Sequence, residues 1–414
     1  MRLLGAVVLA LGLPVHPALA AGPEGTISDF VRIAREMNPE AGAMALEAEA
    51  AAARINSAGA LDDPRFKAEF ELPRAGSGYL PKTRVGEELY QVRQMFPLWG
   101  KRELKRGIAE WDSRKARSQQ AEIENQLAYR VKVVYAEYHA AHLAADETKA
   151  LLGTIRRMAE LARARYAQGP GKQQDVTSAE AERGVLSAEL ARMEADRRRA
   201  QVRLNGLLNR MSDTPLPARP QPRLIPPLEL MSVDALVERG RTDFPAVRTQ
   251  EAQIQSSEKS RQLVERGWYP DLEVGVGAIR REGRFDGYQA MVEFNIPLQA
   301  ERRRAEQREA TLMTSSARAK LDQIRLEVAT DINEAHAMLK ALGERKRIVR
   351  ETTLPQARIA VESAMRGYEL GREEFSNVLL MEQTLRRALI EFVNVTYEEQ
   401  IRLADIERLI GGEL

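Results

Sequence analysis

The chain has 414 residues, 44% of them hydrophobic and 29% charged, which is typical of globular or coiled proteins and not of disordered ones. Its 62 basic and 60 acidic residues nearly cancel, so the charge balance gives no indication of a nucleic-acid partner. The absence of cysteine excludes disulfides, thiolate metal sites and a lipid-modified cysteine.

The N-terminus has the pattern of a secretory signal peptide. Arg2 supplies a positive charge, residues 3–13 form a short apolar run, and small residues ending at Ala20 suit a cleavage site. The apolar run is too short to span a bilayer as a helix. We therefore predict a signal peptide at residues 1–20 and a mature chain that begins near Ala21, outside the cytoplasm.

The sequence repeats itself in two halves. Tyr166 and Tyr368 are each followed three residues later by a glycine, Gly169 and Gly371. The number of residues that separates Tyr166 from Tyr368 also separates Asp175-Val176 from Asn377-Val378, and Glu180 from Glu382. Such an ordered series of matches indicates a tandem duplication. The segment between the halves is rich in proline, which cannot continue a helix. We predict a first repeat at residues 21–210, a proline-rich linker at 211–231 and a second repeat at 232–414.

Each half contains two segments in which apolar and polar residues alternate, as in strands with one apolar face. The segments lie at residues 66–72, about 87–96, 272–278 and 288–296, with a turn expected at 282–287. The alternation at 87–96 is blurred, and the repeat supports that strand.

The clear strands have roughly the 9–11 residues that a tilted transmembrane strand needs. No segment after the signal peptide is long and apolar enough for a transmembrane helix. Two ordinary hairpins on a soluble sheet are the alternative. Aromatic residues cluster where strands meet helices and suit an interfacial girdle: Phe96, Trp99, Trp268 and Tyr269.

Long helices occupy most of the remaining sequence. Residues 28–59 are rich in Ala and Glu, which favour helix. Residues 101–168 contain no proline and, as a continuous helix, span about 100 Å. Apolar residues recur every three or four positions between Ile123 and Ala141, and again between Val378 and Val395. This coiled-coil spacing predicts helices that pair over a great length.

The combination of strands and long helices indicates a conduit. A barrel in lipid must close, and four strands are too few, since about eight is the usual minimum. Several chains must therefore share one barrel if the strands lie in a membrane. A ring of long helices that leaves this barrel on one side surrounds a central pore.

These features resemble the TolC family of outer-membrane efflux proteins. The resemblance covers essentially the whole mature chain and includes both Tyr-x-x-Gly turns and both strand-ending Phe/Ile-Pro-Leu segments. Residues 96–101 (FPLWGK) and 287–298 (GYQAMVEFNIPL) are most similar to the heavy-metal branch, of the CzcC and CusC type.

The resemblance implies a mainly α fold with a transmembrane β-barrel: a homotrimer with a twelve-strand barrel in outer-membrane lipid and an α-helical barrel across the periplasm. It implies two protein partners, a periplasmic adaptor and an inner-membrane pump. The helix-hairpin turns at residues 166–176 and 368–378 are then the periplasmic tip, which contacts the adaptor and closes the pore. The implied tip residues are Tyr166, Gly169, Asp175, Val176, Tyr368, Gly371, Asn377 and Val378, with a gate link between Asp175 and Tyr368.

Two positions depart from the family pattern at the second turn. A basic residue that the family carries two places after the turn glycine is Glu373 here, and the aspartates that narrow the pore are replaced by Asn377 and Leu380.

A purely structural interpretation of the turn residues is equally open. Glycines at helix ends adopt the left-handed conformation, as we expect for Gly169 and Gly371. Asp175 or Thr177, and Ser376 or Asn377, are expected to cap the helices that follow.

The sequence shows no catalytic or cofactor motif. It lacks a phosphate-binding loop, a nucleophile elbow and an HExxH motif. His139 and His142 lie on one helix face and could share a metal, but no third ligand is visible, and solvated histidines are commoner. We therefore expect no enzyme activity, cofactor or resident metal, and transport driven by a partner pump.

The sequence favours an outer-membrane channel that conducts small molecules or metal ions passively from the periplasm to the exterior. A periplasmic adaptor is the first alternative, although an adaptor would carry one helical hairpin and not a duplication of the whole chain. A coiled-coil scaffold without a pore is the second, but it leaves the aromatic strand ends unexplained. The substrate, the particular pump and the resting state of the tip do not follow from the sequence.

Overall fold

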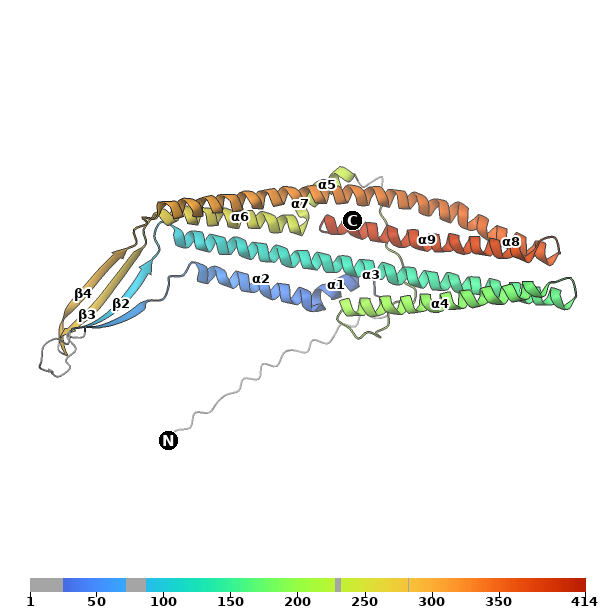
Figure 1. Cartoon of the computed structure of the whole chain (residues 1–414), viewed down its shortest axis with the longest axis horizontal. Coiled ribbons are helices and arrows are strands. Elements are labelled where there is room, and N and C mark those ends of the chain that lie inside the picture. The colour runs from blue at the N-terminus through green and yellow to red at the C-terminus, as the bar shows by residue number, and fades with distance from the viewer. Residues whose placement is uncertain (1–24, 72–86, 228–231, 282) are drawn as a thin grey trace, which may run out of the picture.

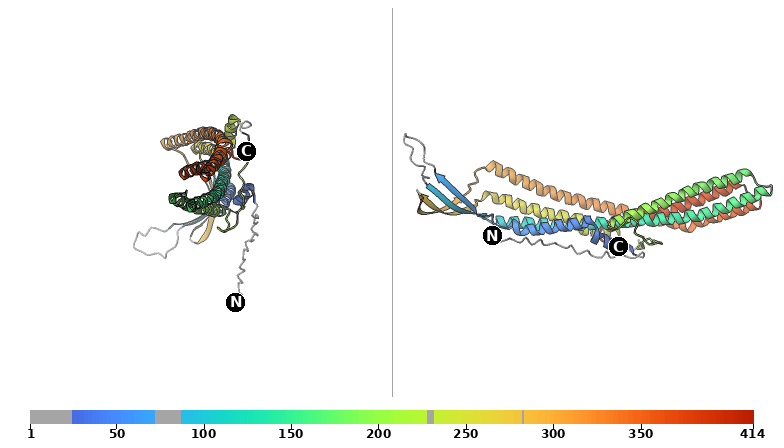
Figure 2. Two further views of the ribbon diagram at one scale, coloured as in Figure 1. Left: turned by 90° about the vertical axis from the view of Figure 1, so that its right-hand side faces the viewer. Right: turned by 90° about the horizontal axis from the view of Figure 1, so that it is seen from below.

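The computed structural model describes residues 25–71, 87–227, 232–281 and 283–414. The chain is elongated, with four strands at one end and two helical hairpin turns at the other (Figures 1 and 2). The expected signal peptide lies outside the described residues.

The first half of the chain runs helix, helix, strand, strand, long helix, helix. Its elements are α1 (Ile27–Met37), α2 (Pro39–Ala58), β1 (Arg65–Glu71), β2 (Glu87–Phe96), α3 (Lys101–Ala167) and α4 (Gln173–Leu207). The helix expected at 28–59 is interrupted at Asn38, because a residue before proline avoids the helical conformation. The Asn38 side chain instead caps α2 by accepting a hydrogen bond from the Glu40 N–H at 2.9 Å.

The second half follows the same order with one extra break. Its elements are α5 (Val233–Asp243), α6 (Pro245–Glu265), the 3₁₀ turn η2 (Arg266–Trp268), β3 (Leu272–Arg281), β4 (Arg284–Phe294), α7 (Ala300–Ile348), the π-helical turn η3 (Val349–Thr353), α8 (Leu354–Glu369) and α9 (Phe375–Leu409). Pro355 follows η3 and cannot donate a backbone hydrogen bond, so the wider turn accommodates it inside one continuous helix. The division of the chain into repeats at 21–210 and 232–414 stays a prediction.

Helix α3 has 67 residues and is the longest element of the described chain. It packs against α2 and α6 towards the strands and against α4 and α9 towards the hairpin turns. The predicted apolar stripe is confirmed, since Leu127, Val131, Val134 and Tyr138 are buried. Most of the stripe on the returning helix is also buried: Val378, Leu385, Ala388 and Val395.

The four strands form one antiparallel sheet in the order β1-β2-β3-β4. The weakly predicted second strand is confirmed, and it joins the two halves of the chain by pairing with β3, with Val92 opposite Val276. The turn expected at 282–287 is longer than the structure allows. Strand β4 begins at Arg284, and a register shift at Ile279/Arg280 lets residues of the expected turn continue the ladder.

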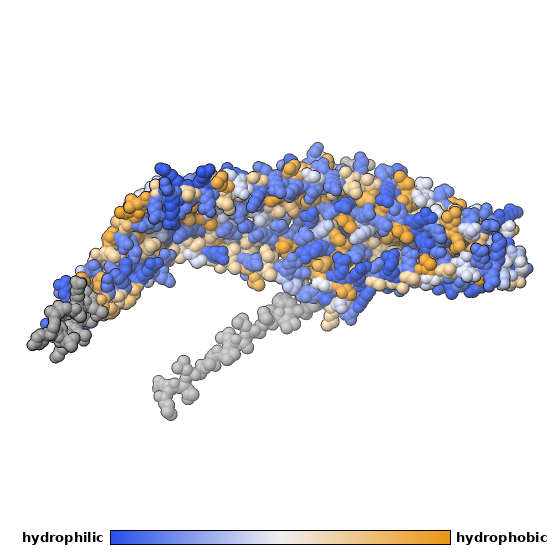
Figure 3. All heavy atoms as spheres, viewed as in Figure 1, coloured by the Kyte–Doolittle hydropathy of each residue, from blue (hydrophilic) through white to orange (hydrophobic). Residues whose placement is uncertain are grey.

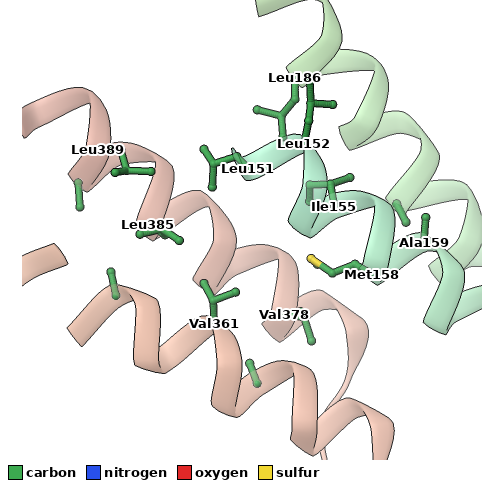
Figure 4. Close-up of a cluster of buried hydrophobic side chains, with 14 of the residues drawn as sticks. Leu151, Leu152, Ile155, Met158, Ala159, Leu186, Val361, Val378, Leu385 and Leu389 are labelled. Atoms are coloured by element: carbon green, nitrogen blue, oxygen red, sulfur yellow. The ribbon is translucent and has the colours of Figure 1, made fainter. Parts of the chain in front are cut away.

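The buried side chains of the helices form three clusters along the rod. The cluster nearest the hairpin turns, here called the distal core, is shown in Figure 4 and joins α3, α4, α8 and α9. The other two lie about the middle of the molecule, one around Phe30, Val131 and Leu204 and the other around Ile332 and Ile406. Alanines are frequent in the distal core and in the cluster around Phe30, which suits close helix packing, whereas the cluster around Ile332 is mostly Leu, Ile and Val.

A buried ionic cluster holds the linker against the helices. Lys132 on α3 lies 3.0 Å from Glu407 on α9, and Arg223 of the linker pairs with the same carboxylate. All three side chains are at most 10% exposed. The Arg223 backbone N–H and carbonyl both bond the side chain of Gln400, at 3.2 and 2.9 Å. The linker thus binds α9 at this point, and the shared Glu407 carboxylate connects it to Lys132 of α3.

Glu407→Gln is expected to destabilise the helical region by about 3–5 kcal/mol, because buried Arg223 loses its counter-charge and buried Lys132 keeps only the exposed Glu413, 3.6 Å away. The denaturant midpoint of the helical circular dichroism signal of the detergent-solubilised protein measures this. Glu36→Gln is the matched control: its partner Arg32 is 3.4 Å away on an exposed helix face, and the expected change is below about 0.5 kcal/mol. Equal midpoints for the two variants would contradict the prediction.

Candidate functional site

One face of the sheet is apolar and exposed. Cross-strand pairing brings Phe66, Val92 and Val276 into one row of this face and places Tyr288 next to Ala278 in another. Val276 is 64% exposed and Tyr288 86% exposed. Figure 3 shows hydrophobic residues over this end of the molecule, whereas hydrophilic residues cover most of the visible helix surface. A contiguous apolar surface of this kind indicates contact with lipid or with another chain.

The opposite face of the sheet is polar. It carries Lys67, Arg93 and Glu273, with Arg93 and Glu273 3.7 Å apart. Gln91 lies on this face at 3% exposure, close above the strand carrying Gly275 and Gly277. A Cβ at Gly277 would come within 2.7 Å of the Tyr90 carbonyl oxygen, which explains why this strand position is glycine.

The sheet has two open edges among the described residues. Strand β1 pairs with β2 alone and β4 pairs with β3 alone, so β1 and β4 do not meet. Each edge presents backbone N–H and C=O groups that can pair with another strand.

The junction between strands and helices is held by one lysine. The Lys101 ammonium at the start of α3 lies 2.8 Å from Asp271 Oδ1 and donates to the Tyr269 carbonyl at 2.9 Å. The Trp99 indole N–H donates to the Pro270 carbonyl at 2.9 Å, and the Trp99 and Tyr269 rings are 5.1 Å apart. Trp99 has a φ of 62°, which turns the chain from β2 into α3.

The four predicted girdle residues all lie at this junction. Phe96 ends β2 and Trp268 ends η2, both partly buried, while Trp99 and Tyr269 are about half exposed. Sequence reasoning missed the role of Lys101 and Asp271. Their charge opposition across two distant segments was the available signal.

The tip contains the two hairpin turns. Gly169 and Gly371 have φ values of 99° and 72°, so the expected left-handed conformation is confirmed. The expected helix caps are wrong. Helices α4 and α9 begin after Lys172 and Glu374, whose side chains make no capping hydrogen bond. Asp175 lies inside the first turn of α4, and Asn377 donates to Glu373 at 2.9 Å.

Asp175 accepts a hydrogen bond that joins the two hairpins. The Tyr368 hydroxyl at the end of α8 donates to Asp175 Oδ2 at 2.8 Å. Tyr368 is 3% exposed, and burial together with this bond raises its pKa to about 12. Arg165 on α3 lies over the Tyr368 ring, 4.6 Å from its centroid, and donates to the Tyr368 carbonyl. Sequence reasoning did not single out Arg165.

The two halves differ at the tip. Tyr166, the counterpart of Tyr368, is 50% exposed. Val378 is buried at 1% exposure and Val176 packs partly buried against the distal core. The cross-hairpin bond therefore uses one member of each pair of matched residues, Asp175 from the first half and Tyr368 from the second.

The two histidines predicted to share a face lie in the middle of α3. His139 is 9% exposed and His142 lies 3.7 Å from Asp146. Burial lowers the pKa of both imidazoles. Within the described ranges, no group of three or more His, Cys, Asp or Glu side chains is arranged to hold a metal ion.

The helices of the described chain are amphipathic or polar along most of their length. None of them is both long enough and apolar enough to cross a bilayer.

The comparison with protein families is decisive. The model of the outer membrane efflux protein family matches residues 31–210 and 237–412, which together make up most of the chain. The chain belongs to the outer membrane efflux protein family. The adaptor and scaffold alternatives raised by the sequence are thereby set aside.

Individual relatives support the heavy-metal branch of this efflux family. The chain is 25% identical over 412 residues to the cobalt-zinc-cadmium resistance protein CzcC of Cupriavidus metallidurans, covering 96% of this chain and 93% of CzcC. It is 27% identical over 334 residues to the nickel-cobalt-cadmium resistance protein NccC of Alcaligenes xylosoxydans xylosoxydans, covering 77% and 71%. The resemblance to CzcC-type proteins is confirmed.

A solved structure shows the same fold as this efflux protein. The outer-membrane channel OprN superimposes with a TM-score of 0.81 at 17% identity, covering 93% of this chain and 90% of OprN. The predicted fold class, with long helices and a four-stranded contribution to a barrel, is confirmed.

Proposed function

We propose that three copies of this efflux protein close their sheets into one barrel in the outer membrane and conduct solutes passively to the exterior. The observation that carries this is the sheet with two open edges, one apolar exposed face and one polar face. Pairing β4 of one copy with β1 of the next satisfies both edges, which lipid requires. The apolar face then meets lipid and the polar face lines the lumen.

The helices extend the conduit into the periplasm. The signal peptide at residues 1–20 directs export, and the repeats at 21–210 and 232–414 each supply one long hairpin to a helical barrel. Phe96, Trp99, Trp268 and Tyr269 sit at the membrane interface. The chain contributes no enzymatic step, because conduction needs no bond to be made or broken.

The tip is the site of closure and of assembly with partners. The Tyr368–Asp175 bond joins the two hairpins of one copy and holds the closed state. The surrounding turns, with Tyr166, Gly169 and Gly371 exposed, contact a periplasmic adaptor, which connects the duct to an inner-membrane pump that supplies the energy.

Divalent heavy-metal cations are the cargo we propose. Support comes from CzcC and NccC, which are named for resistance to cobalt, cadmium, zinc or nickel. The polar sheet face carries both signs of charge, so it suits passage and not tight binding.

The test uses the mature protein extracted from outer membranes in detergent. We expect a particle of three chains by sedimentation, and conductance to Co²⁺ and Zn²⁺ after insertion into a planar bilayer. A monomer that does not insert would overturn the proposal. If the trimer conducts but deletion of its gene leaves the host's tolerance of cobalt and zinc unchanged, the proposed cargo is wrong and the proposed channel stands.

A further inference from the structure

Glu382 on α9 is a carboxylate buried without a partner. Its side chain is 0% exposed, and neither Oε1 nor Oε2 has a hydrogen-bond partner. It lies in the helix that carries Val378 and Leu385 into the distal core. A buried polar group without a partner is rare, and a buried unpaired charge is strongly unfavourable.

The first half of the chain shows what is missing. Glu180 occupies the matching position and pairs with Arg163 on α3 and with Arg183, 2.7 Å away on α4. At the same offset in the second half the two arginines are replaced by Met365 and Leu385, which pack with the distal core. The second half thus keeps the carboxyl, as Glu382, but has apolar side chains in place of both of its cationic partners.

The charged side chains near Glu382 form ion pairs with one another and not with Glu382. Arg386, one turn away on α9, lies 2.8 Å from Glu182 and 4.0 Å from Glu189, both on α4. Among the described residues these three charged groups act on Glu382, and burial outweighs Arg386 to raise the pKa of Glu382 to about 7. Helices α3 and α8 contribute apolar side chains to the distal core, among them Ile155, Met158 and Val361 (Figure 4).

We propose that Glu382 makes the packing of α9 against its neighbours depend on a proton. The carboxyl holds the proton while the helices are packed as in this structure, and releases it when α9 moves into water. Acidic pH therefore favours the packed hairpins and alkaline pH favours their separation. The inference rests on the proposed function in one respect, which is that the packed hairpins are the closed tip.

The direction of the pH effect follows from linkage. Below about 4.5, the ordinary value, the carboxyl is protonated in both arrangements, and packing carries no penalty. Above about 7 it is ionised in both, and packing carries the whole penalty of burying a charge. Across this window the ratio of packed to separated hairpins falls by on the order of 100-fold as pH rises.

A distance measurement between the two hairpin turns tests this. Because the natural chain has no cysteine, Gln168→Cys and Leu370→Cys place spin labels at exposed, matching positions in the two turns. We expect the distance distribution of the detergent-solubilised full-length protein to lengthen or broaden between about pH 5 and pH 8. An unchanged distribution would overturn the proposal.

Substitutions in the labelled protein assign the effect to one carboxyl. Glu382→Gln stays neutral at every pH, so its distribution should remain short, whereas the matched control Glu180→Gln should respond like the parent. A Glu382→Gln protein that responds like the parent would overturn the assignment.

A second variant restores the missing partner. Met365→Arg places a cation where the first half has Arg163, so the carboxylate becomes paired and the transition should move below about pH 5. If the Met365→Arg protein keeps the transition of the parent, the proposal is overturned. This variant keeps the test decisive even if the Glu382→Gln protein does not fold. Planar-bilayer conductance of the parent separates the two hypotheses, since a conducting channel without a pH-dependent distance leaves the proposed function intact.

Discussion

Val292→Arg is expected to prevent membrane assembly of this protein while its helices still fold. Val292 is 63% exposed on the apolar face of β4, opposite Val274 of β3. An arginine facing lipid near the bilayer centre costs about 2–4 kcal/mol, and a three-chain barrel carries that cost in each copy. The fraction of protein that resists extraction from outer membranes and migrates as a heat-labile trimer measures the effect.

Gln289→Arg provides the matched control for the barrel prediction. Gln289 lies on the same strand but on the polar face, opposite Gly277, and it is exposed. An arginine there meets water in the lumen, so assembly should be close to that of the parent protein. Equal loss in both variants, or in neither, would show that the two faces of the sheet are not lipid-facing and lumen-facing.

Tyr368→Phe is expected to raise the open fraction of the channel by about 10- to 100-fold. The change removes the hydroxyl that donates to Asp175 at 2.8 Å and leaves the ring packed against Phe375. A hydrogen bond to a charged group contributes about 1.5–3 kcal/mol, which sets the size of the effect. Single-channel recordings in planar bilayers measure the open fraction.

The gate link should itself be insensitive to pH in the neutral range. Burial and the bond to Asp175 raise the pKa of Tyr368 to about 12, so the hydroxyl keeps its proton and the stabilisation is lost only as pH rises through that value. Tyr166→Phe is the control. Because Tyr166 is 50% exposed, this substitution should leave the open fraction unchanged. A Tyr368→Phe channel that opens no more often than the Tyr166→Phe channel would contradict the gate assignment.

The helices and strands were predictable because their periodicity is long and regular. The stripe from Leu127 to Tyr138 and the strand around Val292 each repeat one pattern over several turns or residues. The strand at 87–96 was weaker, because Glu87 and Arg93 form ion pairs across the sheet and Gln91 is a polar residue buried on it, which an isolated strand pattern does not require. Its existence followed from the repeat alone.

The errors at the tip have a single physical origin. Capping preferences are local, and they assigned Asp175 to its own helix end. In the structure Tyr368 of the other hairpin binds that carboxylate, a contact that only the family resemblance had implied, and Arg165 lies over the tyrosine ring. Which distant side chain arrives at a given turn depends on how the hairpins pack. Lys101 and Asp271 at the junction were missed for the same reason.

The pairing of β2 with β3 also constrains the order in which the protein folds. The two strands are separated along the chain by α3, α4, α5 and α6, so the sheet cannot form until most of the polypeptide is available. The hairpin contacts are closer in sequence and can form earlier, since long-range pairing is slow. Folding chains are therefore expected to hold formed helices while their apolar strands are still unpaired. Unpaired strands with an apolar face aggregate readily, so this interval is the stage of folding most exposed to aggregation.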